Sequence, residues 1–161
     1  MTTVKAFAPA KINLTLHVTG QRPDGYHLLE SLVVFADFGD RLTLRPASKT
    51  SLSVSGPMSE AVPVDERNLA VRAANLTSAV VRIDLEKHLP AAAGIGGGSS
   101  DAAAVLRGIQ ALTGAPLPAD QGLALGADVP VCLLGKAACM SGIGEKVEPI
   151  IGFPRVHAVL V

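Results

Sequence analysis

Apolar and polar residues alternate strictly near the start of the chain, in the pattern of a β-strand with one buried face. The alternation covers residues 11–18. Its apolar positions are Ile12, Leu14, Leu16 and Val18, and its polar positions are Lys11, Asn13, Thr15 and His17. The turn-forming stretch 21–27, which contains proline, aspartate and glycine, comes next. We therefore expect a half-buried strand that ends in a turn.

The next segments predict two more strands, a helix and a further strand. Residues 28–38 form a long strand pattern, and Gly39-Asp40 predicts a hairpin turn into a strand over 41–45. Asp65 predicts a capped helix over about 66–76. A short alternating strand follows, with Val81, Ile83 and Leu85 on its apolar face.

The second half begins with a helix rich in alanine and leucine. Ser99 or Ser100 should cap it, and it should run to about residue 112, before Gly114 and Pro116. A short helical piece should precede Asp128. We expect short strands around the turn 141–144 and in the apolar run at the end; their ranges are 129–134, 137–140, 146–151 and 156–161. Strands mixed irregularly with helices indicate an α+β fold.

Composition limits the classes of function. The chain has 161 residues, 48% of them hydrophobic and 3% aromatic, so we expect one domain with a core of Ala, Val, Leu and Ile. Fourteen basic residues balance fourteen acidic ones without a basic run, which argues against a nucleic-acid partner. Cys132 and Cys139 lie among apolar neighbours and indicate reduced core cysteines. No stretch reaches the roughly 20 apolar residues of a membrane span, so we expect a cytoplasmic protein without a membrane partner.

A glycine-rich loop directly before the alanine-rich helix carries the clearest chemistry. Glycines let a ligand approach the backbone, and the N–H groups of a first helical turn attract anions such as phosphate. The pattern fits neither a Walker A nor a Rossmann loop. It predicts a nucleoside triphosphate site, with a flexible connector as the alternative. The residues are Pro90, Ala91, Ala92, Ala93, Gly94, Ile95, Gly96, Gly97, Gly98, Ser99 and Ser100.

Three charged residues are further candidates. Lys11 shares the polar face of its strand with Asn13, so both can point into one cleft, although a solvated lysine fits the same pattern. Asp128 lies among apolar neighbours and needs a partner, which Lys11 could supply; the alternative is a helix or turn cap. Asp101, one turn into the helix, has either a metal or catalytic role or a favourable place in the helix dipole. The histidines at 17, 88 and 157 show no metal-ligand spacing, and we predict no metal site formed by side chains alone.

Three segments together resemble the GHMP small-molecule kinases: residues 8–14 (APAKINL), the glycine loop, and residues 125–130 (LGADVP). Residues 20–27 (GQRPDGYH) are similar to the members that act on a cytidine-diphosphate-linked methylerythritol. The resemblance implies an α+β fold of the ribosomal protein S5 domain 2-like type, a mixed sheet with helices on one side. It also implies that residues 1–161 form an N-terminal ATP-binding domain, and that the family's C-terminal GHMP domain is absent from this chain, which could then be inactive alone.

The resemblance further implies an ATP- and Mg²⁺-dependent kinase of the non-mevalonate isoprenoid (terpenoid) pathway, a monomer or homodimer. It would phosphorylate the 2-hydroxyl of its substrate, with Lys11 and Asp128 as catalytic residues. The substrate-binding residues would be Asn13, Tyr26, His27 and Asp128, with Tyr26 and His27 at the cytidine. Asn68 and Lys87 would lie near the adenine.

Several alternatives remain at this point. Tyr26 and His27 could simply pack, Asn68 could cap a helix, and Lys87 could be a solvated strand end. The whole protein could be another GHMP kinase, of the homoserine or mevalonate type. It could also be a non-catalytic binding module, because the first domain of the family resembles folds found in ribosomal proteins.

Overall fold

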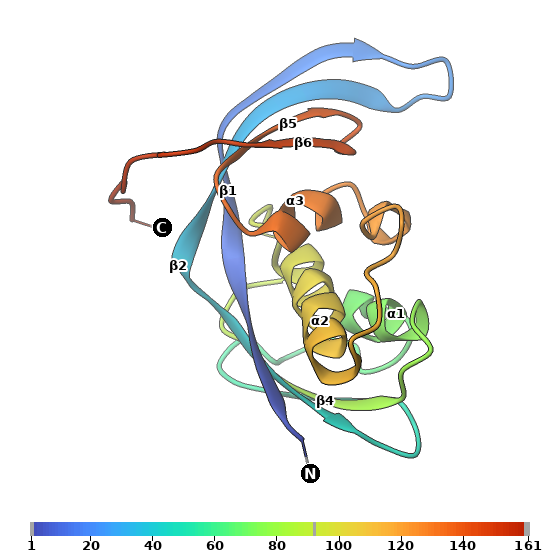
Figure 1. Cartoon of the computed structure of the whole chain (residues 1–161). Coiled ribbons are helices and arrows are strands. Elements are labelled where there is room, and N and C mark those ends of the chain that lie inside the picture. Colours follow the sequence, from blue (N-terminus) through green and yellow to red (C-terminus); the bar gives the residue numbers. More distant parts are fainter. Residues whose placement is uncertain (1, 92, 160–161) are drawn as a thin grey trace.

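A long curved hairpin supports the whole fold. The computed structural model describes residues 2–91 and 93–159. β1 (Val4–Gln21) runs antiparallel to β2 (His27–Pro46), and their register extends from Val4 opposite Leu44 to Gln21 opposite His27. The predicted turn joins the two strands. Figure 1 shows the hairpin arching over the side of the molecule that carries α3, β5 and β6.

Four shorter strands complete a mixed sheet. They are β3 (Ser51–Ser55), β4 (Val81–Glu86), β5 (Ala138–Gly142) and β6 (Lys146–Pro149). The order is β3-β4-β2-β5-β6, and β1 pairs with β2; β3 and β4 are parallel, whereas the other pairs are antiparallel. The predicted strands at 81–86, 137–140 and 146–151 are confirmed, with small differences in their ends.

The helices all lie on one side of this sheet (Figure 1). They are α1 (Leu69–Asn75), α2 (Gly97–Thr113) and α3 (Val129–Leu134), with a short 3₁₀ helix, η1 (Leu123–Leu125), before α3. The predicted α+β fold, with a mixed sheet and helices on one side, is therefore confirmed. Within the part of the chain that the structure describes, none of the helices has the length and apolar character needed to cross a bilayer.

The core lies between α2 and the central strands. Ala102, Ala103 and Ala104 are fully buried, and small side chains let the helix approach the sheet closely. Gly108 is needed at this contact, because a Cβ atom there would lie 2.8 Å from Leu44 Cδ1. Aliphatic side chains and alanines make up this core, as the low aromatic content predicted.

The predicted hairpin turn at Gly39-Asp40 is wrong. Both residues lie inside β2, which continues without a break to Pro46. Gly39 is required there by contact rather than by a turn: a Cβ atom would lie 2.2 Å from the carbonyl oxygen of Ala8 on β1. Asp40 is fully buried rather than solvated.

The predicted burial of the apolar face of β1 is also wrong. Leu14, Leu16 and Val18 are 43%, 58% and 67% exposed, whereas Lys11 is only 4% exposed. The register between β1 and β2 shifts between Pro9 and Lys11, which marks a β-bulge or similar irregularity. Burial along β1 ends at Lys11: Ile12 and Asn13 are half-buried, and both the apolar and the polar positions over 14–18 are exposed, because this part of the hairpin extends beyond the core.

The ends of two helices differ from the prediction. α1 begins at Leu69 with Asn68 as its cap, because the Asn68 side chain accepts a hydrogen bond from the Ala70 N–H (2.9 Å), while the Asp65 carboxylate accepts one from the Arg67 N–H instead. α2 begins at Gly97, earlier than a cap at Ser99 or Ser100 would allow. The predicted end of α2 at Gly114 is confirmed.

Three further predictions are corrected. Residues 129–134 form helix α3 rather than a strand, since Pro130 suits a first helical turn and a continuous apolar run has no period that distinguishes the two. Residues 156–159 belong to no strand, and residues 160 and 161 lie outside the described part. Cys132 is buried as predicted, but Cys139 is exposed on β5.

Candidate nucleotide-binding site

The glycine-rich loop connects β4 to the N-terminus of α2. Gly94 and Gly96 have φ angles of +71° and +65°, in the left-handed region that favours glycine. Gly96 is the residue before the helix, and its carbonyl accepts a hydrogen bond from the Ser100 N–H (2.8 Å). Among the described residues, the earlier N–H groups of the helix, over 97–99, have no partner four residues earlier. The Ile95 carbonyl accepts a hydrogen bond from the Lys11 N–H (2.9 Å), which ties the loop to β1. Predicted site residue Ala92 lies outside the described residues.

The exposed backbone and one buried hydroxyl make this loop suitable for an anion. Ala93, Gly94 and Gly98 are exposed, so a ligand can reach their backbone. The Ser100 side chain is fully buried at the same helix end, and its Oγ has no hydrogen-bond partner among the described residues. A buried hydroxyl without a partner carries a desolvation cost that a ligand oxygen could remove.

Lys11 and Asp128 form an ion pair beside the loop. Lys11 Nζ lies 3.0 Å from Asp128 Oδ2, so the predicted pairing is confirmed. A Cβ atom on Gly96 would lie 3.0 Å from Lys11 Cβ, which shows how closely the lysine packs against the loop. The alternative of a solvated lysine is wrong, since Lys11 is buried. Asp128 precedes α3, but its side chain makes no capping hydrogen bond, and the carboxylate stays 32% exposed.

A short hydrogen-bond chain orients the lysine. Lys11 Nζ donates to Asn13 Oδ1 (2.7 Å), and Asn13 Nδ2 donates to Ser31 Oγ (2.6 Å). The Ser31 hydroxyl in turn donates to the carbonyl of Thr15 (2.7 Å). The predicted sharing of one face by Lys11 and Asn13 is confirmed. The role of Ser31 was missed, because its position in β2 carries no distinguishing pattern.

A buried cluster of charges lies beneath the loop. Lys87 Nζ contacts Asp40 Oδ2 and lies 2.8 Å from Asp101 Oδ2, and all three residues are at most 4% exposed. Burial raises the pKa of Asp101 to about 7, which the charge of Lys87 only partly offsets. For Lys87, burial lowers the pKa, but the two carboxylates outweigh it and the pKa rises. The solvated strand end proposed for Lys87 is therefore wrong.

Asn68 is held by local hydrogen bonds. Besides capping α1, its Nδ2 donates to the carbonyl of Pro63 (2.8 Å). The residue is only 8% exposed. The helix-cap alternative is thus confirmed, and Asn68 fixes the path of residues 63–68 next to the core.

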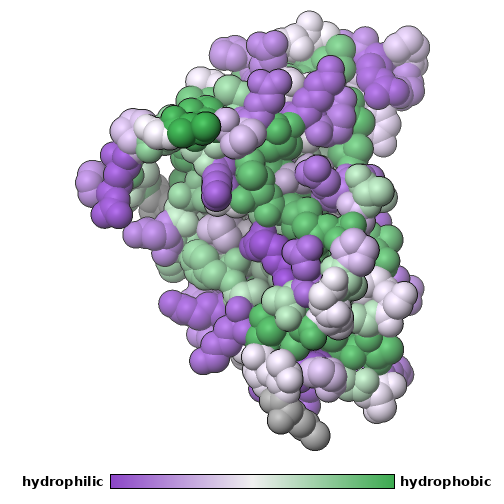
Figure 2. Space-filling model, in the orientation of Figure 1, coloured by the Kyte–Doolittle hydropathy of each residue, from purple (hydrophilic) through white to green (hydrophobic). Residues whose placement is uncertain are grey.

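Tyr26 and His27 lie apart from the loop, at the end of the β1–β2 hairpin. Both are exposed, and Tyr26 is 62% exposed, so neither packs into the core. Hydrophilic side chains gather over this end of the hairpin (Figure 2). The structure therefore brings together the glycine loop, Lys11 and Asp128, and places Tyr26 and His27 at the turn end of the β1–β2 hairpin.

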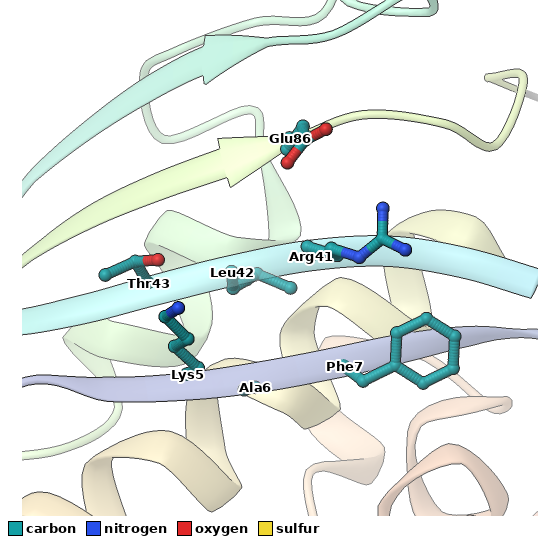
Figure 3. A pocket seen from close by; sticks show the side chains of 7 residues that line it. All are labelled: Lys5, Ala6, Phe7, Arg41, Leu42, Thr43 and Glu86. Carbon is teal, nitrogen blue, oxygen red and sulfur yellow. The ribbon is translucent and has the colours of Figure 1, made fainter.

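A groove on the other face of the sheet is separate from this site. It is lined by residues of β1, β2 and β4, including Lys5, Phe7, Arg41 and Glu86. Figure 3 shows these side chains on the side of the strands away from the helices. Among the described residues, no three His, Cys, Asp or Glu side chains lie close enough to hold a metal ion.

The fold and the loop agree with comparisons to known proteins. Residues 68–140 match the family described as GHMP kinases N terminal domain. The matched residues include the glycine loop and Asp128, so this part of the chain is similar to the GHMP kinases. A solved homoserine kinase from Cytophaga hutchinsonii ATCC 33406 shares the fold, with a TM-score of 0.53 at 21% identity, over 84% of this chain and 43% of that one.

Several proteins with higher sequence identity to this chain share one name. A 4-diphosphocytidyl-2-C-methyl-D-erythritol kinase from Dinoroseobacter shibae is 64% identical over 98% of this chain and 55% of the relative. A protein of the same name from Ruegeria pomeroyi is 53% identical over 98% of this chain and 58% of the relative. A crystal structure of 4-(cytidine 5'-diphospho)-2C-methyl-D-erythritol kinase has a TM-score of 0.73 and 43% identity, over 91% of this chain and 55% of that one. The chain spans little more than half the length of these relatives.

Proposed function

We propose that this chain forms the nucleotide-binding part of an ATP-dependent kinase. The kinase phosphorylates the 2-hydroxyl of 4-diphosphocytidyl-2-C-methyl-D-erythritol, in the cytoplasmic non-mevalonate route to isoprenoids. The observation that carries the proposal is the Lys11–Asp128 ion pair, which lies beside a glycine loop at a helix N-terminus. The names of the similar proteins support this acceptor, and the match of residues 68–140 to a GHMP kinase N-terminal domain supports the assignment of residues 1–161 to that domain.

In this proposal, residues 90–100 bind the triphosphate. The N–H groups of residues 97–99 offer hydrogen bonds to phosphate oxygens, and the dipole of the 17-residue helix α2 favours negative charge at this end. The Ser100 hydroxyl, at the same end of α2, supplies a further hydrogen-bond donor. Mg²⁺ commonly binds through substrate phosphates and retained waters, so it can enter with the nucleotide although side chains alone form no cage here.

Lys11 and Asp128 act on the transferred group. The exposed part of the Asp128 carboxylate can accept the proton of the substrate hydroxyl or orient that hydroxyl toward the γ-phosphorus. Lys11 pairs with this carboxylate and offers positive charge to the transferring phosphoryl group. Phosphoryl transfer depends mainly on positioning and charge neutralisation, which is what a buried, hydrogen-bonded lysine beside the loop provides.

The remaining predicted residues have supporting roles in this proposal. Asn13 orients Lys11 and faces the acceptor, while Tyr26 and His27 bind the cytidine end from the hairpin that arches over the helical side (Figure 1). The exposed Tyr26 ring is free to stack on a pyrimidine. Asn68 and Lys87 shape the adenine side through the backbone segments they hold, because their polar side-chain atoms are already engaged.

The test is steady-state turnover in the protein at its full natural length. Lys11→Ala or Asp128→Ala should lower turnover by about 10²-fold or more while the Kd of ATP stays within a few-fold, since both groups act on the transition state. Lys5→Ala is the matched control, because Lys5 is an exposed lysine of the same strand that lines the groove on the other face of the sheet. Near-normal turnover in both test variants would show that Lys11 and Asp128 take no part in the reaction.

The acceptor is tested separately. The wild-type protein should phosphorylate the cytidylyl methylerythritol and leave homoserine and mevalonate unchanged. Turnover of either of those alcohols instead would support a kinase that acts on a different substrate. Tight, salt-sensitive RNA retention without any turnover would favour a binding module.

A further inference from the structure

The buried cluster beneath the glycine loop contains one cation and two carboxylates. Asp40 comes from the middle of β2, Lys87 follows β4 just before the loop, and Asp101 lies on α2 just after it. The cluster therefore connects both ends of the loop to the central strand. A Cβ atom on Gly97 would lie only 3.3 Å from Lys87 Nζ, so the cluster directly underlies the first turn of α2.

The two carboxylates differ in their hydrogen bonds. Asp40 accepts from Lys87 Nζ through Oδ2 and from the backbone N–H groups of His88 and Leu89 through Oδ1 (2.8 Å for Leu89), so both of its oxygens have partners. Asp101 accepts from Lys87 through Oδ2 alone, and its Oδ1 has no partner among the described residues. Asp101 is thus the member of the cluster with an open position for a proton.

We propose that Asp101 is a positioning residue for the glycine loop and that it takes up a proton when nucleotide phosphates occupy that loop. The proposal rests on the proposed function, because it requires a triphosphate in the loop. With Asp101 ionised, the cluster carries a net negative charge directly below an anion site. With Asp101 protonated, Lys87 and Asp40 balance each other, and the repulsion of the phosphates is removed.

The other charged groups around α2 do not account for this proton uptake. Lys11 on β1 and Asp128 before α3 pair with each other, and burial raises the pKa of the Cys132 thiol to about 12. Arg107, on α2 itself, donates to the carbonyl groups of Cys132 and Phe7. On α1, the one titratable residue is the exposed Arg72. The His88 side chain lies with Glu86 and Arg41 rather than with the cluster.

The direction of the effect follows from linkage. The pKa of Asp101 already stands at about 7 in the free protein, so the group is partly ionised at neutral pH. Phosphate charge in the loop raises this pKa further, and a raised pKa means that protons are bound together with the nucleotide. The affinity for ATP should therefore fall as the pH rises above about 7, by at most about tenfold for each pH unit.

Isothermal calorimetry of Mg·ATP binding, without acceptor, measures this proton directly. Titrations in buffers of different ionisation enthalpy at pH about 8 should show uptake of roughly half a proton or more per nucleotide bound. Excess Mg²⁺ keeps the terminal phosphate of the nucleotide ionised throughout. Asp101→Asn keeps the shape of the side chain and removes its titration, so uptake should vanish and the affinity should become nearly independent of pH. A purely structural role for Asp101 would change stability without a proton signal.

The possible results separate this inference from the proposed function. A wild-type protein that binds Mg·ATP without proton uptake overturns the inference alone. A wild-type protein that does not bind Mg·ATP overturns the proposed function and the inference with it. Unchanged uptake in a folded Asp101→Asn variant, with folding checked by thermal melting, assigns the proton to another group and also overturns the inference. If that variant does not fold, the number of protons that the wild-type protein takes up per nucleotide bound tests the inference on its own.

Discussion

Gly39 lies against the backbone of β1, and its replacement by alanine should separate the two strands. The new Cβ would lie 2.2 Å from the carbonyl oxygen of Ala8 and 2.6 Å from Pro9 Cα. Both atoms belong to backbone, so no side chain can move away. To reach an ordinary contact the strands must part locally by roughly 1 Å.

The cost can be estimated from this displacement. Overpacking costs about 1–3 kcal/mol, and each weakened ladder hydrogen bond near the contact adds about 1 kcal/mol. We therefore expect a loss of about 2–4 kcal/mol in the free energy of unfolding. With a typical dependence on urea, the midpoint should fall by about 1–2 M. Turnover should fall as well, because Gly39 pairs with Pro9, two residues before Lys11.

The assay is urea denaturation followed by far-ultraviolet circular dichroism, with Gly20→Ala as the control. Gly20 lies in the same hairpin, and a Cβ there would meet only Leu28 Cδ1, at 3.6 Å. Its midpoint should stay at the wild-type value or rise slightly, since alanine reduces the entropy of the unfolded chain. If Gly39→Ala and Gly20→Ala unfold at the same urea concentration, the continuous path of β2 past Gly39 is refuted.

Two other predictions concern the loop and the cysteines. Gly97→Val should raise the Kd of ATP by about tenfold or more, because it blocks the approach of phosphate to the backbone. The control is Gly114→Val at the other end of α2, where no atom lies within 4 Å of an added Cβ. It should lower stability but leave the Kd of ATP unchanged. An equal loss of affinity in both would contradict this. Iodoacetamide should modify the exposed Cys139 in the native protein and the buried Cys132, whose pKa is about 12, only after unfolding. Peptide mapping distinguishes the two, and native modification of Cys132 would show that its burial is wrong.

Local sequence patterns predicted those parts of the fold whose cause is itself local. The alternation at 81–85 predicted β4, the turn residues at 21–27 predicted the end of the hairpin, and Gly114 predicted the end of α2. The same reasoning failed where distant contacts decide. Gly39-Asp40 resembles a turn, but it serves a close approach to β1 and a buried ion pair with Lys87.

The candidate site shows the same division. Residue types alone indicated an anion-binding loop at 90–100 and two charged residues in need of partners. Neither composition nor spacing could show that Lys11 is buried, because its burial depends on packing against the glycine loop, which is far away in the chain. The Asp40–Lys87–Asp101 cluster was missed for a related reason, since its members come from three elements that only the packed sheet and helix bring together.

The sequence by itself therefore determined the class of fold and the likeness to a family, and it predicted an anion-binding loop. These follow from glycine's backbone freedom, from hydrophobic periodicity and from motifs of adjacent residues. The tertiary structure alone decided which face of β1 is buried and which charges meet beneath the loop. Burial and ion pairing depend on distances between segments far apart in the chain, and no local pattern contains those distances.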